Sequence, residues 1–314
     1  MSTSYIFKKY IWLVNTILER KSITLREISE MWQRSSIGDG RPLPRSTFNR
    51  YKEDIQDIFG ICIECEKRNS DYSYYISNKD EIRDGSIQRW MLNTLSVNNM
   101  LSDGVSISHR IVLEPIPSAT GSLRTIIEAM KQSKELNMTY MKYVSTEPKH
   151  YVIAPYCLKL FKRRWYVVGR IRKIDQEGEK ECDGLRIFSL DRIQQIEPNG
   201  QSFVMDEGFD AERYFATTFG VMHDDNVAPQ RVLIRAYGRE AMAIKDLPIH
   251  PSQHIVNETN GYTDFELNNI SPTWDFVGYI LSRSARVKVL EPKSLIDMIV
   301  DSLNEMKMQY ETEG

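Results

Sequence analysis

The chain has 314 residues, of which 41% are hydrophobic and 27% are charged, and its formal net charge is −2. This length predicts two or three domains, and this composition is typical of globular proteins rather than disordered chains. The sequence lacks an apolar run of roughly 18–20 residues and the cysteine density of a disulfide scaffold, and its first residues do not predict a secretory signal. We therefore expect a cytoplasmic protein with reduced cysteines and no membrane contact.

Three helices are predicted within the first 60 residues. The first spans about residues 5–19, where apolar side chains recur at helical spacing. Thr24 followed by Glu27 matches a capping box, which predicts the start of a second helix. After a turn rich in Gly and Pro, a third helix is predicted from about Pro44 to Gly60, because Pro is favoured at a helix start and Gly just past a helix end.

The third helix is predicted to be amphipathic, with a buried stripe formed by Phe48, Tyr51, Ile55 and Ile58. The apolar period then changes to two over residues 61–76, which predicts a β-hairpin. Three helices followed by a hairpin is the order of a winged helix-turn-helix domain, whose third helix enters the major groove of DNA while its wing contacts the backbone. The candidate DNA-binding residues on this helix and in the hairpin turn are Arg45, Ser46, Thr47, Asn49, Arg50, Lys52, Lys67 and Arg68.

The residue types on this face suit DNA, since Arg and Lys bind phosphate or guanine and Asn binds adenine. The alternative is a protein-docking domain whose third helix is only solvated, because residues 1–80 hold 13 Lys and Arg against 11 Asp and Glu. The turn before the third helix is also longer than in a tight helix-turn-helix. Cys62 and Cys65 look like a metal-binding pair, but in a strand they would point to opposite faces, and no second pair lies at zinc spacing.

A helical connector is predicted over residues 81–120. Its apolar stripe would pack against the N-terminal domain or against a second copy of the chain, and consists of Ile87, Trp90, Met91, Thr94 and Leu95. Pro115 and Pro117 then mark a boundary. The next helix is predicted from about Ser122 to Leu136, with four inward side chains, Leu123, Ile126, Ile127 and Met130.

A basic region rich in predicted strands follows. Residues 140–192 hold 12 Lys and Arg against seven Asp and Glu, which indicates a surface that meets anions. Short strands predict a small, strongly bent sheet or barrel, and lie at residues 138–144, 151–153, 156–161, 165–168 and 185–190. In the fourth strand Trp165 and Val167 face one way and Tyr166 the other. Consecutive pairing of these strands would bring Tyr, His and Arg side chains together.

These residues resemble those of the WYL-domain transcriptional regulators. Three blocks carry the resemblance: Ala154-Pro155-Tyr156 to Leu158, Trp165-Tyr166-Val167-Val168-Gly169 at the Trp-Tyr-Leu signature, and Arg186 to Ile193. The resemblance implies a winged helix-turn-helix domain and a five-stranded Sm-like or SH3-like barrel that senses a ligand. It also implies a C-terminal extension that completes the ligand site or the dimer. The implied ligands are single-stranded DNA or RNA, or a nucleotide messenger.

The six candidate ligand-binding residues are Tyr140, Lys142, His150, Tyr166, Arg186 and Arg192. Strand register suggests the first three, and matching position in the family implies the last three. The sequence departs from the family at Val167, where the signature has Leu, and at Ser189, where the family has a second Arg. Arginine forks bind phosphate and aromatic rings stack on bases. The alternative is that Tyr166 belongs to the core and that Arg192 pairs with a carboxylate such as Asp191.

The C-terminal part is predicted to differ in both charge and topology. After a linker at residues 206–225, residues 226–314 show the β-α-β-β-α-β order of a ferredoxin-like unit. Residues 193–314 hold 10 Lys and Arg against 19 Asp and Glu, which argues against direct contact with DNA. His250 and His254 are expected in a surface turn rather than at a metal, because the intervening proline prevents a helical pair.

The sequence as a whole predicts an α+β multidomain regulator. Its expected parts are a winged helix-turn-helix DNA-binding domain (1–80), a helical connector (81–120), a WYL Sm-like sensing domain (121–205), a linker (206–225) and a C-terminal extension (226–314). We recognise no catalytic frame, metal site or cofactor motif, and so expect no enzyme. The expected partners are a double-stranded DNA operator, a nucleic-acid or nucleotide effector, and a second copy in a homodimer. The alternatives are a protein that binds RNA or single strands and a nucleotide-processing enzyme.

Overall fold

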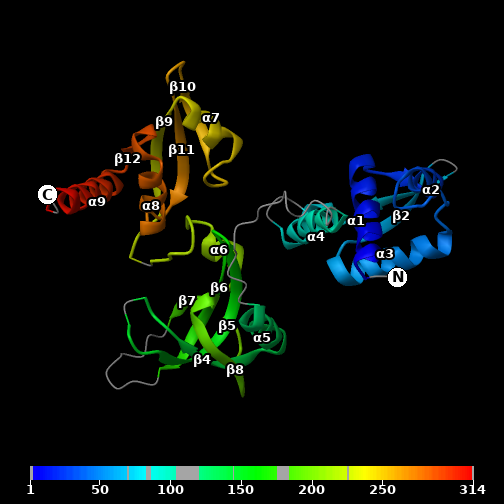
Figure 1. The fold of residues 1–314 in the computed structure, drawn as a ribbon, viewed down its shortest axis with the longest axis horizontal. Helices are drawn as coiled ribbons and strands as arrows, with labels where there is room; N and C mark the ends of the chain where they lie inside the picture. The colour runs from blue at the N-terminus through cyan, green and yellow to red at the C-terminus, as the bar shows by residue number, and fades with distance from the viewer. Residues whose placement is uncertain are drawn as a thin grey trace. The chain divides into compact units, whose positions relative to one another are not determined.

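The computed structural model describes residues 3–68, 71–82, 86–103, 120–143, 145–174, 184–224 and 226–312. The chain divides into two compact units, Met1–Glu114 and Pro115–Gly314, and both combine helices with antiparallel sheets (Figure 1). The expected mixed α+β class is therefore confirmed. The predicted features at Gly104, Pro115, Pro117, Val144 and Cys182 lie outside the described residues. No helix in the described ranges has both the length and the apolarity of a membrane span.

The N-terminal unit is built from helices around a small sheet (Figure 1). Its elements are α1 (Thr3–Arg20), β1 (Ile23–Thr24), α2 (Leu25–Arg34), α3 (Arg45–Phe59), β2 (Ile63–Arg68), β3 (Asp71–Ile76), the 3-10 helix η1 (Lys79–Ile82) and α4 (Ile87–Asp103). β3 pairs with both β2 and β1, so the sheet order is β1-β3-β2. The three helices and the hairpin expected from the sequence are present in that order, and β1 is an addition to the prediction.

The capping box predicted at the start of α2 is present. The Thr24 hydroxyl accepts a hydrogen bond from the Glu27 amide at 3.3 Å, and the Glu27 carboxylate accepts one from the Thr24 amide at 2.9 Å. The first amides of a helix have no acceptor within it, so this reciprocal pair fixes where α2 begins. From that start, the helical period carries Ile28 and Trp32 into the core of the unit.

α3 begins and ends where the sequence predicts, and its last residue precedes Gly60, which has a φ of 66°. Glycine adopts this left-handed conformation without a steric penalty, so it ends the helix. The predicted buried stripe is wrong only at its last position, because Ile58 is 41% exposed. Phe59 is buried instead, and its ring lies 6.2 Å from that of Phe7 in α1. Phe59 follows Ile55 by four residues and therefore continues the same helical face.

α4 packs on the N-terminal unit, which was one of its two predicted contacts. Leu92 is 2% exposed within the core of that unit, and Met91 and Leu95 pack against the same core. Ile87 and Trp90, which the prediction placed on the buried stripe, are 65% and 45% exposed. The buried face of α4 is therefore rotated from the predicted one towards Leu92.

The first half of the second unit is an antiparallel sheet covered by a helix. Its elements are α5 (Thr120–Gln132), β4 (Lys134–Tyr140), β5 (Lys149–Phe161), β6 (Arg164–Ile174), β7 (Leu185–Ser189), the 3-10 helix η3 (Leu190–Arg192) and β8 (Ile193–Ser202). The first four strands pair consecutively and β8 returns beside β4, which gives the order β7-β6-β5-β4-β8. Ile126 of α5 packs with Leu136, Val167 and Phe188 of the sheet in a common core.

β5 is one strand, although the sequence predicted two strands at residues 151–153 and 156–161. Its pairing with β6 shifts register between Pro155 and Cys157. A proline has no amide to donate to a neighbouring strand, and irregular pairing of this kind accommodates it. The proline thus interrupts the ladder without ending the strand.

Two further predictions for this sheet are corrected. β8 was not predicted at all, and α5 ends at Gln132 rather than at Leu136. Ser133 has a φ of 51°, a left-handed conformation in which the chain leaves the helix and enters β4. On α5 itself, Ile127 is 36% exposed, whereas Ala129 is 3% exposed, so Ala129 takes the inward place predicted for Ile127.

The second half of this unit contains a four-stranded sheet in the order β10-β11-β9-β12. Its elements are α6 (Ala211–Phe215), β9 (Gln230–Tyr237), α7 (Arg239–Asp246), β10 (His254–Glu258), β11 (Tyr262–Ile270), α8 (Trp274–Ser282), the 3-10 helix η4 (Ser284–Arg286), β12 (Val287–Glu291) and α9 (Lys293–Thr312). From β9 to β12 the described elements follow the predicted β-α-β-β-α-β order. The short helix α6 was not predicted, and the Asp210 side chain caps it by accepting the Arg213 amide at 2.6 Å.

Candidate nucleic-acid interface and effector site

The N-terminal half of α3 presents a polar face to solvent. Six of the predicted DNA-binding residues lie on it: Arg45, Ser46, Asn49 and Arg50 are exposed, and Thr47 and Lys52 are half-buried. On the other side of the helix Phe48 and Tyr51 are 0% and 3% exposed. Burial of these two rings fixes the rotation of α3 about its axis and keeps the polar residues outward.

The cations of this face are not neutralised by neighbouring carboxylates. Across the described ranges, no carboxylate forms an ion pair with Arg45 or Arg50. Asp54, one turn after Arg50, accepts a hydrogen bond from the Tyr10 hydroxyl at 2.6 Å and is thereby tied to α1. Burial and this hydrogen bond raise the pKa of Tyr10 well above its ordinary value, so Tyr10 remains a donor. The guanidinium groups of α3 thus keep their donors for a ligand.

The two remaining predicted DNA-binding residues lie at the tip of the hairpin. Lys67 pairs with Tyr72 and Arg68 with Asp71 across β2 and β3, and residues 69 and 70 between these strands lie outside the described residues. Lys67 is exposed, and the side chain of Arg68 is also outside the described set. β2 therefore carries at least one exposed cation near its end.

A second polar cluster lies where the loop after β4 meets the start of β6 and the end of η3. The Tyr143 hydroxyl accepts a hydrogen bond from Arg164 Nη1 at 2.7 Å, and the Arg192 guanidinium lies 3.5 Å from the centre of the Tyr143 ring. Arg192 Nε also donates to the Met141 carbonyl at 2.6 Å. We term Tyr143, Arg164 and Arg192 the arginine–tyrosine cluster.

One carboxylate adjoins this cluster. Asp191 Oδ2 lies 3.5 Å from Arg164 Nη2, and the Ser189 hydroxyl donates to Asp191 Oδ1. The hydrogen bond to Tyr143 and the charge of Asp191 both raise the pKa of Arg164, which stays protonated. Asp191 pairs with Arg164, so two guanidinium groups lie near one carboxylate. The cluster together with Asp191 therefore has a net positive charge.

Tyr166 lies on β6 beside the cluster, on the opposite face of the strand from the buried Val167. Burial raises the pKa of the Tyr166 phenol, and the nearby Arg164 charge partly lowers it. Across β5, Tyr166 pairs with Lys159, whose Nζ lies 3.8 Å from the centre of the Phe215 ring in α6. Burial lowers the pKa of Lys159 to about 8. An aromatic and a cationic group thus extend the polar surface along the sheet.

The segment that holds this sheet matches a known family. Residues 121–198 match the profile of the WYL domain. The chain contains a WYL domain. Residues 228–307 match the WCX domain, which covers β9 to most of α9. The resemblance inferred from the three sequence blocks is therefore confirmed.

Two solved structures show a low level of similarity to this WYL-domain protein. Proteasome accessory factor B/C (PafBC) of Arthrobacter aurescens is 16% identical with a TM-score of 0.36, over 94% of this chain and 46% of that one. A structure described as a CRISPR Cas-related protein is 9% identical with a TM-score of 0.38, over 99% of this chain and 83% of that one. The chain spans less than half of PafBC, and neither similarity carries a functional argument. No curated protein sequence matches the chain.

The structure distributes the predicted ligand residues over several parts of the WYL domain. Arg192 belongs to the arginine–tyrosine cluster, and Tyr166 lies beside it. Lys142 is half-buried in the loop that carries Tyr143. Tyr140 is 9% exposed in the core, where its hydroxyl accepts the Ser189 amide at 3.4 Å and burial raises its pKa.

Arg186 lies on the other face of the sheet from Tyr166. β6 and β7 pair Tyr166 with Ser189, Val167 with Phe188 and Gly169 with Arg186. Since Val167 and Phe188 are both in the core of the WYL domain, the period of two places Arg186 on the face of Phe188. The register therefore separates Arg186 from the arginine–tyrosine cluster.

His150 lines a separate polar groove of about 310 Å³ on the outer face of β4, β5 and β8. Its Nδ1 is 3.0 Å from the Thr139 hydroxyl, and Gln195 and Glu197 of β8 line the same groove. Three strands thus supply hydrogen-bonding groups at one place. Among the residues that the structure describes, no group of three or more possible metal ligands occurs.

Sequence reasoning did not single out Tyr143 and Arg164 as site residues. Arg164 belongs to the cationic run that starts at Lys162, which was a visible signal. Tyr143 gave no comparable signal, because its contact with Arg192 joins residues almost 50 positions apart through the pairing of β4 with β8. Only the folded sheet brings these side chains together.

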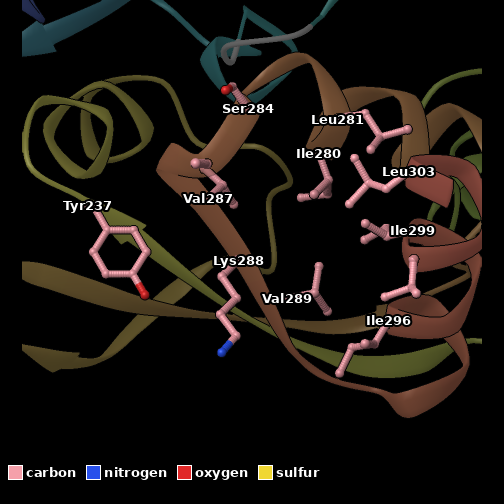
Figure 2. A pocket seen from close by; sticks show the side chains of 12 residues that line it. Tyr237, Ile280, Leu281, Ser284, Val287, Lys288, Val289, Ile296, Ile299 and Leu303 are labelled. Carbon is pink, nitrogen blue, oxygen red and sulfur yellow. The ribbon is translucent and has the colours of Figure 1, made fainter. Parts of the chain in front are cut away.

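The WCX domain has an apolar pocket of about 630 Å³ (Figure 2). Figure 2 shows Ile280 and Leu281 of α8, Val289 of β12, and Ile299 and Leu303 of α9 around it. The pocket differs in chemistry from the arginine–tyrosine cluster, since aliphatic side chains dominate its wall. We assign no ligand to it.

Proposed function

We propose that this WYL-domain protein is a DNA-binding transcriptional regulator that responds to a nucleic-acid or nucleotide-like effector. Residues 1–80 would be a winged helix-turn-helix domain that binds duplex DNA, residues 121–205 an Sm-like sensor, and residues 226–314 a C-terminal extension. The protein would act as a homodimer, because two half-sites on DNA require two copies of the reading helix. Residues 81–120 and 206–225 connect these parts.

The observation that carries the DNA-binding proposal is the polar face of α3. A recognition helix requires exposed donors near its N-terminus, where side chains reach base edges and phosphates. Arg45, Asn49 and Arg50 are exposed there, and no described carboxylate pairs with the two arginines. Arginine suits guanine and phosphate, and asparagine suits adenine. In this proposal Lys67, which is exposed on the hairpin, contacts the DNA backbone.

The arginine–tyrosine cluster supports the effector proposal. Its two guanidinium groups face one carboxylate, which leaves a positive balance for a phosphate. An effector changes DNA binding only when it binds one arrangement of the protein more tightly than another. In this proposal the effector binds at the WYL domain and shifts the arrangement of the paired DNA-binding domains.

The salt dependence of duplex binding tests the DNA-binding proposal. The probe is a duplex enriched from a random-sequence pool by binding to the wild-type chain. We expect Arg50→Ala to weaken binding by ~1–3 kcal/mol if Arg50 contacts a base, or to reduce the salt slope by about one if it contacts a phosphate. Arg20→Ala is the matched control, because Arg20 is an exposed arginine at the end of α1. Equal behaviour of the two variants would overturn the assignment of α3.

A second candidate function is binding of RNA or single strands without a duplex target. The exposed Tyr143 ring between two arginines favours it, since stacking platforms and cations are the common features of single-strand binders. The enrichment experiment separates the two functions. If the pool yields no preferred duplex while the chain still binds single strands, the result would support this second function and contradict the first.

A further inference from the structure

Tyr143 combines high exposure with a fixed position. Tyr143 is 74% exposed, yet Arg164 donates a hydrogen bond to its hydroxyl and the Arg192 guanidinium lies against its ring. The Met141 carbonyl holds Arg192 in turn. Ordering a mobile side chain reduces binding affinity, so a ring that is already held in place loses less on binding. The structure thus presents an aromatic ring that is ordered before a ligand arrives.

One face of this ring is open. The Arg192 guanidinium lies 3.5 Å from the ring centre and covers one face. Because the residue remains 74% exposed, the opposite face meets solvent. A planar base has a π-face of its own and stacks on an exposed aromatic ring whatever its hydrogen-bonding edge. The open face of Tyr143 therefore suits a base better than a compact anion.

Two arginines contact the Tyr143 side chain and have donors that suit a phosphate. Arg192 uses Nε for the Met141 carbonyl, and its terminal nitrogens are further donors. Arg164 donates to the Tyr143 hydroxyl, and Lys162, two residues before Arg164 in the sequence, is exposed. A ligand with a base on Tyr143 would thus find donors for its phosphate within the same cluster.

We propose that Tyr143 is the base-stacking residue of the WYL domain, and that Arg164 and Arg192 bind the phosphate joined to that base. This inference rests on the proposed effector function and names the part of the effector that the site recognises. The chemistry is shared by a single-stranded nucleic acid and a free nucleotide. It excludes an effector that is only an inorganic anion.

The test compares two probes on the full chain. One is a dye-labelled oligothymidylate of 12 residues, and the other is an abasic oligonucleotide of the same length and charge. We expect Tyr143→Ala to weaken binding of the base-bearing probe roughly 5- to 150-fold and to leave the abasic probe unchanged, since stacking contributes only when a base is present. Equal effects on both probes, or no effect on either, would overturn the stacking role.

Conservative variants separate stacking from a structural role. Tyr143→Phe keeps the ring but removes the acceptor for Arg164, and Tyr143→Trp enlarges the stacking surface. We expect both variants to retain oligothymidylate binding within a few-fold of wild type. Tyr310→Ala is the matched control, because Tyr310 is 83% exposed on α9 and shares no contact with the cluster. Failure of Phe and Trp to restore binding would overturn the proposal in favour of a structural hydroxyl.

Arg192→Ala distinguishes failure of this inference from failure of the proposed function. If Arg192→Ala weakens both probes and Tyr143→Ala weakens neither, the effector site stands and the stacking role falls. If Arg192→Ala changes neither probe, or if wild type binds neither, the effector site itself is wrong. Competition by a nucleoside triphosphate separates the two ligand sources: displacement of the oligonucleotide indicates a nucleotide effector, and retention indicates a strand.

Discussion

The Arg192 guanidinium lies 3.5 Å from the centre of the Tyr143 ring, and its Nε donates to the Met141 carbonyl at 2.6 Å. One arginine is therefore fixed by a backbone acceptor and an aromatic face at the same time. A lysine keeps the charge but has neither the planar group for stacking nor a donor nitrogen partway along its side chain. The two contacts consequently depend on arginine rather than on positive charge alone.

Arg192→Lys should weaken binding of the oligothymidylate probe several-fold at constant net charge. The reason is that Tyr143 loses the planar cation that orders it, and the loop loses its link to η3. Fluorescence anisotropy of the labelled probe measures the change. Arg172→Lys is the control, because Arg172 lies in the same WYL domain but is paired with Glu135 at 3.4 Å. Wild-type affinity in Arg192→Lys would show that charge alone suffices.

Thr24→Ala should destabilise the N-terminal unit by about 1 kcal/mol, the usual effect of losing a helix N-cap. The Thr24 hydroxyl accepts the Glu27 amide, and alanine leaves that amide without a protein acceptor. Hydrogen exchange of the α2 amides localises the effect in the full chain. Ser36→Ala is the matched control, since Ser36 is exposed in the turn after α2. Equal protection in the two variants contradicts a role for the capping box.

Asp264 in the WCX domain should make stability depend on pH. Asp264 is 5% exposed and accepts two hydrogen bonds from Arg235, at 2.7 and 2.9 Å. The Arg235 guanidinium holds the pKa of Asp264 below its ordinary value, whereas the unfolded chain titrates near pH 4. The unfolded state therefore binds more protons in acid. Stability from this pair is present above about pH 4 and is lost as the pH falls through the folded pKa.

Asp264→Asn should consequently lower the free energy of unfolding by about 2 kcal/mol at pH 7, because hydrogen bonds to a charged group are lost. The difference from wild type should shrink as the pH falls below 4. Hydrogen exchange of the β11 amides across a urea titration measures both values. A difference that stays constant between pH 7 and pH 3 would show that the Asp264 charge does not contribute.

The sequence was sufficient where local chemistry decides the structure. The Thr24–Glu27 capping box and Gly60 act within a few residues, so the limits of α2 and α3 could be predicted. Alternation likewise identified β6 and β7, and the three WYL blocks identified the family. These features depend on helix caps, glycine conformation and side-chain period, each of which is visible in a short stretch.

The sequence was insufficient where distant segments decide the structure. β8 contains Pro198 and Gly200, residues that usually argue against a strand, and its pairing with β4 alone makes it an edge strand of the described sheet. That same pairing brings Arg192 to Met141 and Tyr143. Without the pairing of β8 with β4, no local pattern could place Tyr143 in the site, and the register of β6 with β7 was needed to separate Arg186 from it.

The central claim is that two separate sites bind two kinds of ligand. The most direct test measures the affinities of Arg50→Ala and Arg192→Ala, each for the enriched duplex and for oligothymidylate. We expect Arg50→Ala to lose duplex affinity and keep single-strand affinity, and Arg192→Ala to show the reverse. Similar losses of both ligands in either variant, or the opposite assignment, would contradict the separation of the α3 interface from the arginine–tyrosine cluster.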